Sequence, residues 1–328
     1  MTNNKGEFDL IRKYFSPLSA DVPGADLLKD DVASLKISEG LVPVVTLDTL
    51  VSGVHFFPND PPGLIAQKLL RVSLSDLAAS GALPIGYFLS LSLPSDIDEG
   101  WIAKFSQGLS EDQERYQVFL HGGDTTRTIG PISLSLTAIG EAPENSIVRR
   151  RGASPGDRIF VTGTIGDAAI GLRLINDLGF KEALDIAPFL VDRYLRPLPR
   201  VELGPLLRDR ATAAIDISDG LAGDAAHIAE ESNVSMIIDC DSIPVSSPAK
   251  RQLKERPDYV NQVVAGGDDY EILFCAPSSV GSWIQKECSS IGIDICEIGF
   301  VTEALNEPVV LRERGETVVF KAKSWQHF

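Results

Sequence analysis

The chain has 328 residues, of which 44% are hydrophobic and 23% charged, an ordinary composition for a globular protein with enough apolar material for two cores. Its net charge of −16 comes from 30 Lys and Arg residues against 46 Asp and Glu residues. Nucleic-acid binding through a basic face is therefore excluded, because the only basic cluster, Arg149–Arg151, is too small for a duplex and suits one triphosphate.

The sequence predicts a cytoplasmic protein that does not enter a membrane. Residues Met1–Phe8 contain no apolar core of signal-peptide length, and no apolar run approaches the roughly 18–20 residues that a membrane helix needs. The cysteines show no CxxC spacing, so we interpret them as buried thiols in a reducing compartment rather than as disulfides or zinc ligands. They are Cys240, Cys275, Cys288 and Cys296.

The first half of the chain alternates strand and helix patterns. Val42–Leu47 is a β-branched apolar run, and Leu64–Ser80 has helical spacing that ends at Gly81. Gly86–Leu93 and Ile132–Ile139 alternate apolar residues with small hydroxyl residues, which predicts two strands with one polar face. That face either meets a partner subunit or is exposed to solvent, and the pattern does not distinguish the two.

A polar segment, Glu141–Arg151, interrupted by Pro143, predicts a domain boundary, and we place the domains at residues 1–148 and 149–328. Strand and helix patterns resume after it, which predicts a two-domain α/β or α+β fold. The expected elements are strand Arg158–Thr162, a helix through Ala169, Leu172 and Ile175, strand Ala211–Ile217, helix Leu221–Glu231, strand Ser235–Cys240, apolar segments Val263–Ala265 and Tyr270–Cys275, helix Ser279–Ile291, and a hairpin of Val309–Arg312 with Thr317–Phe320.

Five segments place aspartates where an apolar run meets a small or polar turn. Clustered carboxylates raise one another's pKa unless a positive charge lies between them, and hard oxygen ligands of this kind suit Mg²⁺. The sequence therefore predicts several magnesium ions on a polyphosphate. The segments are Leu28–Ala33, Thr46–Leu50, Leu74–Ala79, Gly122–Arg127 and Ile215–Gly220.

Two of these aspartates, Asp76 and Asp124, have a local argument of their own. Asp76 shares the apolar face of its predicted helix, where an unpaired carboxylate needs a cation or a firm hydrogen bond. We expect Gly122–Thr126 to form a turn after a strand at Gln117–His121, with backbone N–H groups open to an anion and Asp124 beside it. By contrast, a lone histidine between apolar neighbours, such as His55, is more often a core residue than a ligand.

The segment Asp216–Gly220 predicts a phosphate site. On an extended strand end, residues 216 and 218 share a face, and a turn at Asp219–Gly220 brings Asp219 to the same end of the strand. A helix that starts near Leu221 directs its positive N-terminus there, which favours phosphate.

Several enzyme classes are excluded by missing motifs. The chain contains no GxxxxGK[ST] loop, no GxGxxG after a strand, and no HRD, DFG, HExxH or GxSxG motif. Triphosphate chemistry in this chain therefore depends on metals held by aspartates.

In the order of its motifs, the sequence resembles the thiamine-monophosphate kinase family of the AIR synthetase-like (PurM-like) superfamily. The resemblance spans almost the whole chain. The matching pieces are Gly6–Phe8, Asp30-Asp31, Asp48–Val51, Gly53–Phe56, Ser75–Ala79, Gly122–Arg127, Gly152-Ala153, Pro155–Asp157, Val161–Gly163, Pro197–Arg200, Asp216–Leu221, Gly266–Glu271 and His327-Phe328.

The resemblance implies ATP-dependent phosphorylation of thiamine monophosphate to thiamine diphosphate, with several Mg²⁺ ions. It also implies a homodimer in which N-terminal mixed sheets pair, with ATP bound beside that interface and a C-terminal α/β domain completing the site. Residues at the matching positions would bind metal (Asp30, Thr46, Asp48, Asp76, Asp124, Asp216, Asp219), nucleotide (Asp30, Thr46, Tyr116, Gly123, Asp124, Arg150, Ser218) and thiamine phosphate (His55, Asp268, Trp325), with Asp30, Asp48 and Asp219 central to catalysis.

Three positions depart from the family pattern. Lys29 replaces the usual glycine before the paired acids, and Leu47 replaces a hydroxyl residue, which leaves only backbone ligation there. Asp268 replaces a glutamate, which retracts the carboxylate by one methylene.

Two alternatives remain open from the sequence. One is another member of the superfamily, such as a selenophosphate or aminoimidazole-ribotide synthetase, although the former needs a reactive cysteine near the N-terminus and the first cysteine is Cys240. The other is a regulator that binds nucleotide or divalent metal without turnover.

Overall fold

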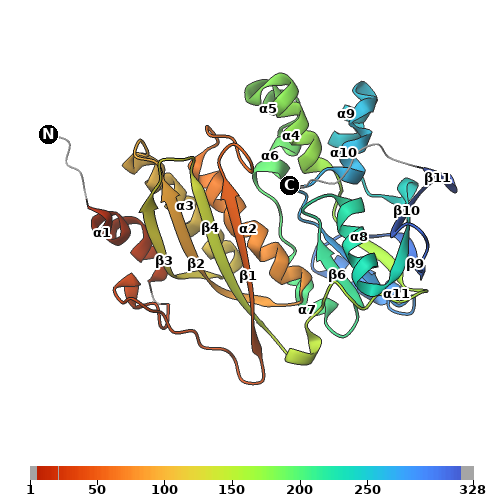
Figure 1. The fold of residues 1–328 in the computed structure, drawn as a ribbon, viewed down its shortest axis with the longest axis horizontal. Helices are drawn as coiled ribbons and strands as arrows, with labels where there is room; N and C mark the ends of the chain where they lie inside the picture. Colours follow the sequence, from red (N-terminus) through yellow and green to blue (C-terminus); the bar gives the residue numbers. More distant parts are fainter. Residues whose placement is uncertain (1–5, 21, 319–328) are drawn as a thin grey trace. The chain divides into compact units, whose positions relative to one another are not determined.

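The computed structural model describes residues 6–20 and 22–318 of the chain (Figure 1). They form two compact units. Unit 1 takes the described residues of Met1–Leu77 and Ala82–Asn145, and unit 2 takes Ala78–Gly81 with the described residues of Ser146–Phe328.

Unit 1 is one sheet covered by two long helices. Its strands are connected in the order β1-β4-β2-β3, with β2 and β3 parallel and the other pairs antiparallel. Its elements are α1 (Glu7–Leu10), η1 (Ile11–Phe15), η2 (Ser16–Ser19), η3 (Asp26–Leu28), β1 (Val42–Val51), α2 (Pro62–Ala79, of which residues 78 and 79 belong to unit 2), β2 (Leu83–Leu93), α3 (Glu99–Tyr116), β3 (Phe119–Arg127), β4 (Ser133–Ala142) and η4 (Glu144–Ser146, of which residue 146 belongs to unit 2).

The two faces of this sheet differ in chemistry. On the inner face, alternate residues such as Leu89, Leu91 and Leu136 are buried beneath α2, as the alternating pattern predicted. Helix α3 lies beside α2 and is joined to it by a buried, bidentate ion pair between Arg71 and Asp112. The outer face carries the hydroxyl residues, so the sequence correctly separated the two sides.

Unit 2 is built on a seven-stranded mixed sheet in the order β11-β10-β7-β9-β5-β8-β6. Its elements are β5 (Arg158–Thr162), α4 (Asp167–Leu178), α5 (Phe180–Ile186), α6 (Pro188–Leu195), η5 (Val201–Leu203), α7 (Gly204–Leu207), β6 (Ala213–Asp216), α8 (Leu221–Ser232), β7 (Val234–Asp239), η6 (Cys240–Ser242), α9 (Ser247–Glu255), η7 (Pro257–Tyr259), α10 (Val260–Ala265), β8 (Ile272–Ala276), α11 (Gly281–Ser290), β9 (Ile295–Glu303), β10 (Val309–Glu313) and β11 (Glu316–Val318).

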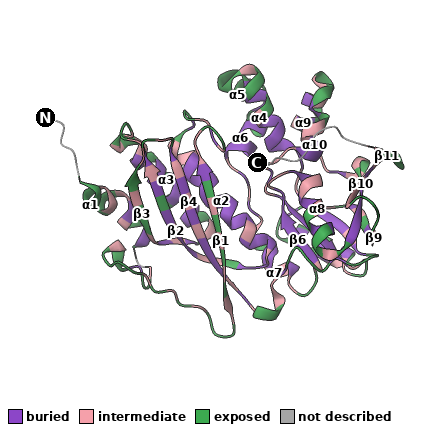
Figure 2. Ribbon diagram, in the orientation of Figure 1, coloured by how far each residue is buried: buried purple, intermediate pink, exposed green. Residues whose placement is uncertain are grey.

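The central strands of unit 2 are buried on both faces. Every residue of β8 is buried, as is β5 from Ile159 onward, so both sides of the sheet are covered there (Figure 2). One face packs on α7 and α11 through the stacked rings of Phe160 and Phe274. This core holds the end of β6 and the start of β8 in fixed positions, next to the polar segment that follows β6 and the one that precedes β8.

The predicted fold class is confirmed, and several elements match closely. Helices α2 and α8 and strand β5 lie within two residues of their expected bounds. One prediction was wrong: Gly122–Thr126 is not a turn but part of strand β3. The apolar segment Val263–Ala265 is the end of helix α10, and the second hairpin strand is described only to Val318.

Two long elements were not predicted at all. Helix α3 begins at Asp98, whose side chain accepts a hydrogen bond from Trp101 N, and strand β9 pairs with both β5 and β7. Among the described residues, none of the helices combines the length and the apolarity that crossing a bilayer requires.

Candidate active site

The first group of predicted site residues gathers under the inner face of the sheet in unit 1. Thr46 and Asp48 lie two residues apart on β1, and both face α2. The Thr46 hydroxyl donates to a carboxylate oxygen of Asp76, and Ser73 Oγ donates to Asp48 Oδ2 over 2.6 Å. The structure therefore brings Thr46, Asp48 and Asp76 together and adds Ser73, which sequence reasoning missed.

The electrostatics of this group favour a cation. Burial, and then the neighbouring Asp76 carboxylate, raise the pKa of Asp48 to about 6, although the Ser73 hydrogen bond acts in the opposite direction. Two carboxylates with two hydroxyl oxygens are a set of hard oxygen ligands. A divalent cation would relieve the repulsion between the acids, so the residues present fit Mg²⁺.

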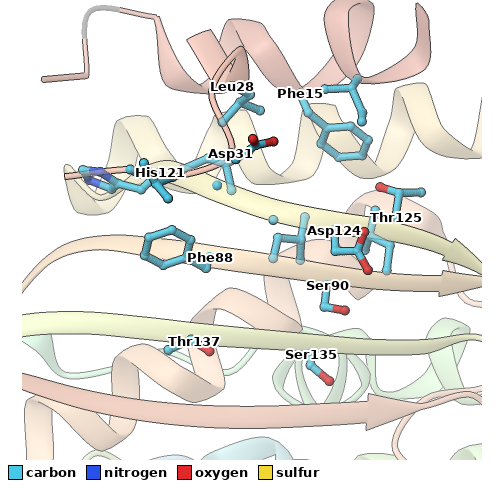
Figure 3. A pocket seen from close by; sticks show the side chains of 18 of the residues that line it. Phe15, Leu28, Asp31, Phe88, Ser90, His121, Asp124, Thr125, Ser135 and Thr137 are labelled. Carbon is cyan, nitrogen blue, oxygen red and sulfur yellow. The ribbon is translucent and has the colours of Figure 1, made fainter. Parts of the chain in front are cut away.

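A second group lines a cavity of 460 Å³ on the outer face of the same sheet (Figure 3). Asp124 on β3 pairs with Ser90 on β2, and Ser135 on β4 lies next to Ser90. Asp30 and Asp31 reach the cavity from the segment after η3. Asp124 and Asp48 thus lie on opposite faces of the sheet within one chain.

The backbone of β3 explains why this cavity contains glycines. His121 is an extra residue in the pairing of β3 with β2, a β-bulge that shifts the register before Gly122. A Cβ atom on Gly123 would lie 2.1 Å from the carbonyl oxygen of Leu89, and one on Gly122 would lie 2.9 Å from the Phe88 ring. These glycines therefore permit close strand contact, rather than the turn that their sequence suggested.

Two further predicted site residues of unit 1, Tyr116 and His55, belong to neither of these groups. Tyr116 ends α3, where the guanidinium groups of Arg71 and Arg115 lie over its ring. His55 Nδ1 accepts a hydrogen bond from Val51 N over 3.0 Å, which leaves the proton of a neutral ring on Nε2.

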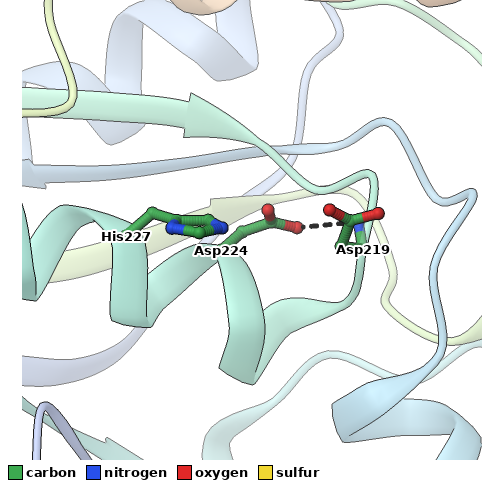
Figure 4. Close-up of side chains that lie close together, drawn as sticks. All are labelled: Asp219, Asp224 and His227. Atoms are coloured by element: carbon green, nitrogen blue, oxygen red, sulfur yellow. Dashed lines mark hydrogen bonds between the residues drawn. The ribbon is translucent and has the colours of Figure 1, made fainter. Parts of the chain in front are cut away.

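In unit 2, the segment after β6 collects several polar groups around Asp224 (Figure 4). Asp224 Oδ2 accepts hydrogen bonds from Ser218 N at 3.0 Å and Asp219 N at 3.1 Å. One ligand atom each from Asp219, Asp224 and His227 lie within 4.8 Å of one another, which is close enough to hold one metal ion. Burial raises the pKa of Asp224 to about 7, against the influence of hydrogen bonds and of the Arg150 charge.

The sequence contained a sign of this arrangement. Asp224 and His227 are three residues apart in α8, immediately after the Asp219–Gly220 turn, and residues at this spacing lie on one face of a helix. Asp216, buried at the end of β6, and Ser218 lie in the same segment, as predicted.

The predicted substrate residue Asp268 is adjacent to this segment. Asp268 N donates to Ser218 O over 2.9 Å, and Tyr270 N donates to Ile217 O over the same distance. Trp325, the third predicted substrate residue, lies outside the described residues.

Comparison with known proteins identifies the class and then the family. The models of the N-terminal and C-terminal domains of AIR synthase related proteins match residues 29–142 and 154–311. The thiamine-monophosphate kinase of Escherichia coli K12 is 40% identical to this chain, covering 98% of each. The chain therefore belongs to the thiamine-monophosphate kinase family and is a phosphotransferase, as its motif order predicted.

Solved structures agree with this assignment. The crystal structure of thiamine-monophosphate kinase from Stenotrophomonas maltophilia K279a superposes with a TM-score of 0.80 at 41% identity, covering 88% of this chain and 90% of that one. The structure described as AaThiL complexed with AMPPCP and TMP superposes with a TM-score of 0.77 at 32% identity, covering 98% and 97%.

Proposed function

We propose that this protein phosphorylates thiamine monophosphate to thiamine diphosphate with ATP. The relatives that match nearly the full chain carry this activity in their names, and one of them was solved with AMPPCP and TMP. The observation in this chain that supports the proposal best is the hydrogen bond between Asp268 N and Ser218 O. Asp268, which the proposal assigns to the acceptor, is thus next to Ser218, which it assigns to the nucleotide.

The chemistry proposed is direct in-line transfer. An oxygen of the thiamine monophosphate phosphate attacks the γ-phosphorus of ATP, and ADP leaves with its bridging oxygen. The second pKa of a phosphate monoester is about 6, so the attacking oxygen is already largely ionised at neutral pH and needs no strong base. The residues of the chain therefore contribute by orienting the two phosphates and excluding competing water.

Magnesium fits the carboxylates on this chain. In the proposal, Thr46, Asp48 and Asp76 hold metal in one group, Asp30 and Asp124 in a second, and Asp216 and Asp219 in a third. When bound, Mg²⁺ would neutralise charge that develops on the phosphate oxygens. Asp30, Asp48 and Asp219 are the residues that we place closest to the reaction.

The remaining predicted residues divide between nucleotide and acceptor. ATP is proposed to contact six residues: Gly123 and Asp124 at the outer-face cavity, Arg150 and Ser218 in unit 2, and Thr46 and Tyr116 in unit 1. His55, Asp268 and Trp325 are proposed to serve thiamine monophosphate. The N-terminal domain, residues 1–148, would then bind ATP and metal and form the dimer, while residues 149–328 complete the site.

A homodimer through the outer face of the N-terminal sheet is part of this proposal. Val45 and Leu47 on strand β1 are 59% and 63% exposed, which is unusual for large apolar side chains on a sheet. They lie beside a row of hydroxyl residues that includes Thr49 and Ser135, whose side-chain oxygens are 2.7 Å apart. Pairing with a second copy would cover these residues.

One coupled assay tests the function. Purified protein with ATP and Mg²⁺ should form thiamine diphosphate from thiamine monophosphate but not from free thiamine. The reason is that an alcohol acceptor needs a general base, whereas an ionised phosphate does not. The proposal is wrong if free thiamine is converted at a comparable rate, or if ATP is consumed equally without any acceptor.

A further inference from the structure

A buried network of charges surrounds the segment that follows Asp268. Glu271 is fully buried, and its carboxylate accepts four hydrogen bonds. Arg200 Nε and Nη2 donate to Oε2 and Oε1 over 2.7 and 2.6 Å, Arg193 Nη2 donates to Oε1 over 2.8 Å, and Thr162 Oγ1 donates to Oε2 over 2.6 Å. Although burial alone would raise it, the arginines hold the pKa of Glu271 below its ordinary value.

The same network holds the main chain of residues 268–271. Arg193 Nη2 also donates to the carbonyl oxygen of Asp269 over 3.3 Å, so one guanidinium group contacts the residues on both sides of Tyr270. The Asp269 side chain, which is fully buried, points the other way and accepts hydrogen bonds from Gly166 N at 2.6 Å and Ala168 N at 3.2 Å. These contacts fix residues 269 and 271 in the interior of unit 2.

The two residues that flank Asp269 have an unfavourable backbone. Asp268 and Tyr270 have φ values of 69° and 50°, in the left-handed region that glycine adopts without strain. Their side chains are half-buried, whereas those of residues 269 and 271 are buried. The network therefore flanks a turn with a left-handed backbone, whose two less buried residues are Asp268 and Tyr270.

This turn is tied to the phosphate segment after β6. In addition to the two hydrogen bonds from Asp268 N and Tyr270 N, Ile217 N donates to Glu271 O over 2.8 Å. The two segments approach so closely that a Cβ atom on Gly267 would lie 2.1 Å from Ser218 O. Any shift of Glu271 would thus move Asp268 relative to Ser218.

A contribution to folding stability does not by itself explain why a buried ion-pair network and a left-handed turn occur here. Apolar side chains of similar volume commonly stabilise a core as well as a buried ion pair does, and glycines at 268 and 270 would remove the strain. We propose that Arg193, Arg200 and Glu271 are positioning residues that hold the turn at 268–270, and with it Asp268, in register with Ser218 for the phosphate acceptor. This inference rests on the proposed function.

The test compares Michaelis constants in the full-length protein. Replacing Arg193 by Lys keeps the charge but loses the planar guanidinium that reaches both Asp269 O and Glu271. We expect Arg193→Lys to raise KM for thiamine monophosphate about 10-fold or more and to leave KM for ATP within about two-fold, because small displacements of an orienting group cost catalysis steeply. If Arg193→Lys does not fold, Arg200→Lys, at a less buried position, replaces it with the same expectation.

A double variant separates positioning from general loosening. Asp268→Asn tolerates the left-handed backbone but removes the charge. If Arg193 acts through Asp268, Arg193→Lys should add no further increase in acceptor KM in the Asp268→Asn background. If the increases in acceptor KM caused by the two substitutions multiply in the double variant, the proposal is overturned.

Asp157→Asn is the matched control. Asp157 is another buried carboxylate of unit 2, which accepts hydrogen bonds from Ser154 N and Thr212 Oγ1, and it has no contact with the turn among those found in the described residues. It should lower Tm without changing the ratio of the two KM values. An equal rise of acceptor KM in Asp157→Asn, or unchanged KM in both arginine variants, would refute positioning. A wild-type protein that does not use thiamine monophosphate would instead refute the proposed function.

Discussion

The carboxylate of Asp48 is held in a position that is costly without a cation. Its pKa of about 6, against an ordinary 3.8, means that Asp48 binds a proton more tightly in the folded than in the unfolded protein. A group of this kind contributes stability below its unfolded pKa, and that contribution is lost as pH rises through the folded pKa. In the metal-free protein, stability should therefore fall between about pH 4 and pH 6 on account of Asp48.

This gives a prediction for Asp48→Asn. The amide resembles the protonated acid, so the variant should have a higher Tm than the wild type at pH 7.5 without metal, by a few degrees. It should also lose activity by about 10²-fold or more, since metal positioning supplies several kcal/mol. In the wild type, Mg²⁺ must displace a proton from Asp48, so the apparent Mg²⁺ affinity should weaken as pH drops below about 6.

Thermal melts with and without Mg²⁺ and nucleotide, together with Mg²⁺ titrations of activity at pH 5.5 and 7.5, would check both parts. A binding ligand stabilises the wild type by mass action, and this shift should be small in Asp48→Asn. Full activity in the variant would show that the carboxylate is structural.

The types of residue and their order along the chain indicated more of the candidate site than the predicted helices and strands did. Helix periodicity placed Asp76 on an apolar face, whereas Thr46 and Asp48 joined it as predicted metal ligands through the resemblance to the family. The roles of Ser73 and His227 depend on which helix turn faces which strand, a tertiary property that periodicity does not fix. The left-handed backbone at Asp268 was equally hidden, because the segment is held by residues far away in the sequence, such as Arg193, which donates to Asp269 O.

At the scale of elements, strand β3 shows how a local pattern was overridden by tertiary packing. A Gly-Gly-Asp sequence favours turns, yet here both glycines lie in a parallel pair of strands next to a bulge at His121. The strand also lies at the edge of its sheet, where weak strand propensity is better tolerated. Helices with clear apolar stripes, such as α2 and α8, were predictable because their own pattern decides which side is buried.

Gly123→Ala should therefore disturb β3 and the outer-face cavity together. The new Cβ would lie 2.1 Å from the backbone of Leu89, which cannot move without separating β3 from β2. We expect a loss of stability of about 1–3 kcal/mol and a higher KM for ATP. Gly130→Ala is the control, because its Cβ would meet Thr128 Oγ1 at an ordinary 3.5 Å. Unchanged Tm and KM in Gly123→Ala would contradict this account of the glycine.

For the whole molecule, the question is how two chains that each carry a net charge of −16 could associate. Long-range repulsion between them is screened by salt, with a Debye length of about 8 Å at physiological ionic strength. Apolar contact must supply the attraction, and Val45 and Leu47 offer it on the outer face of β1. Added salt should consequently strengthen the proposed dimer.

Leu47→Asp is expected to produce a monomer. The substitution places a charge where the proposed interface would bury a leucine that is 63% exposed in the single chain, so the fold of unit 1 should be retained while association is lost. Light scattering after gel filtration, at 50 and 300 mM salt, would measure the mass. Ile186→Asp is the matched control: Ile186 is 45% exposed at the end of α5 and belongs to unit 2, so it is not part of this sheet, and its substitution should leave a dimer intact. A wild-type monomer, or a Leu47→Asp variant that remains dimeric, would rule out pairing through this face, and the exposed apolar residues of β1 would then need a different partner.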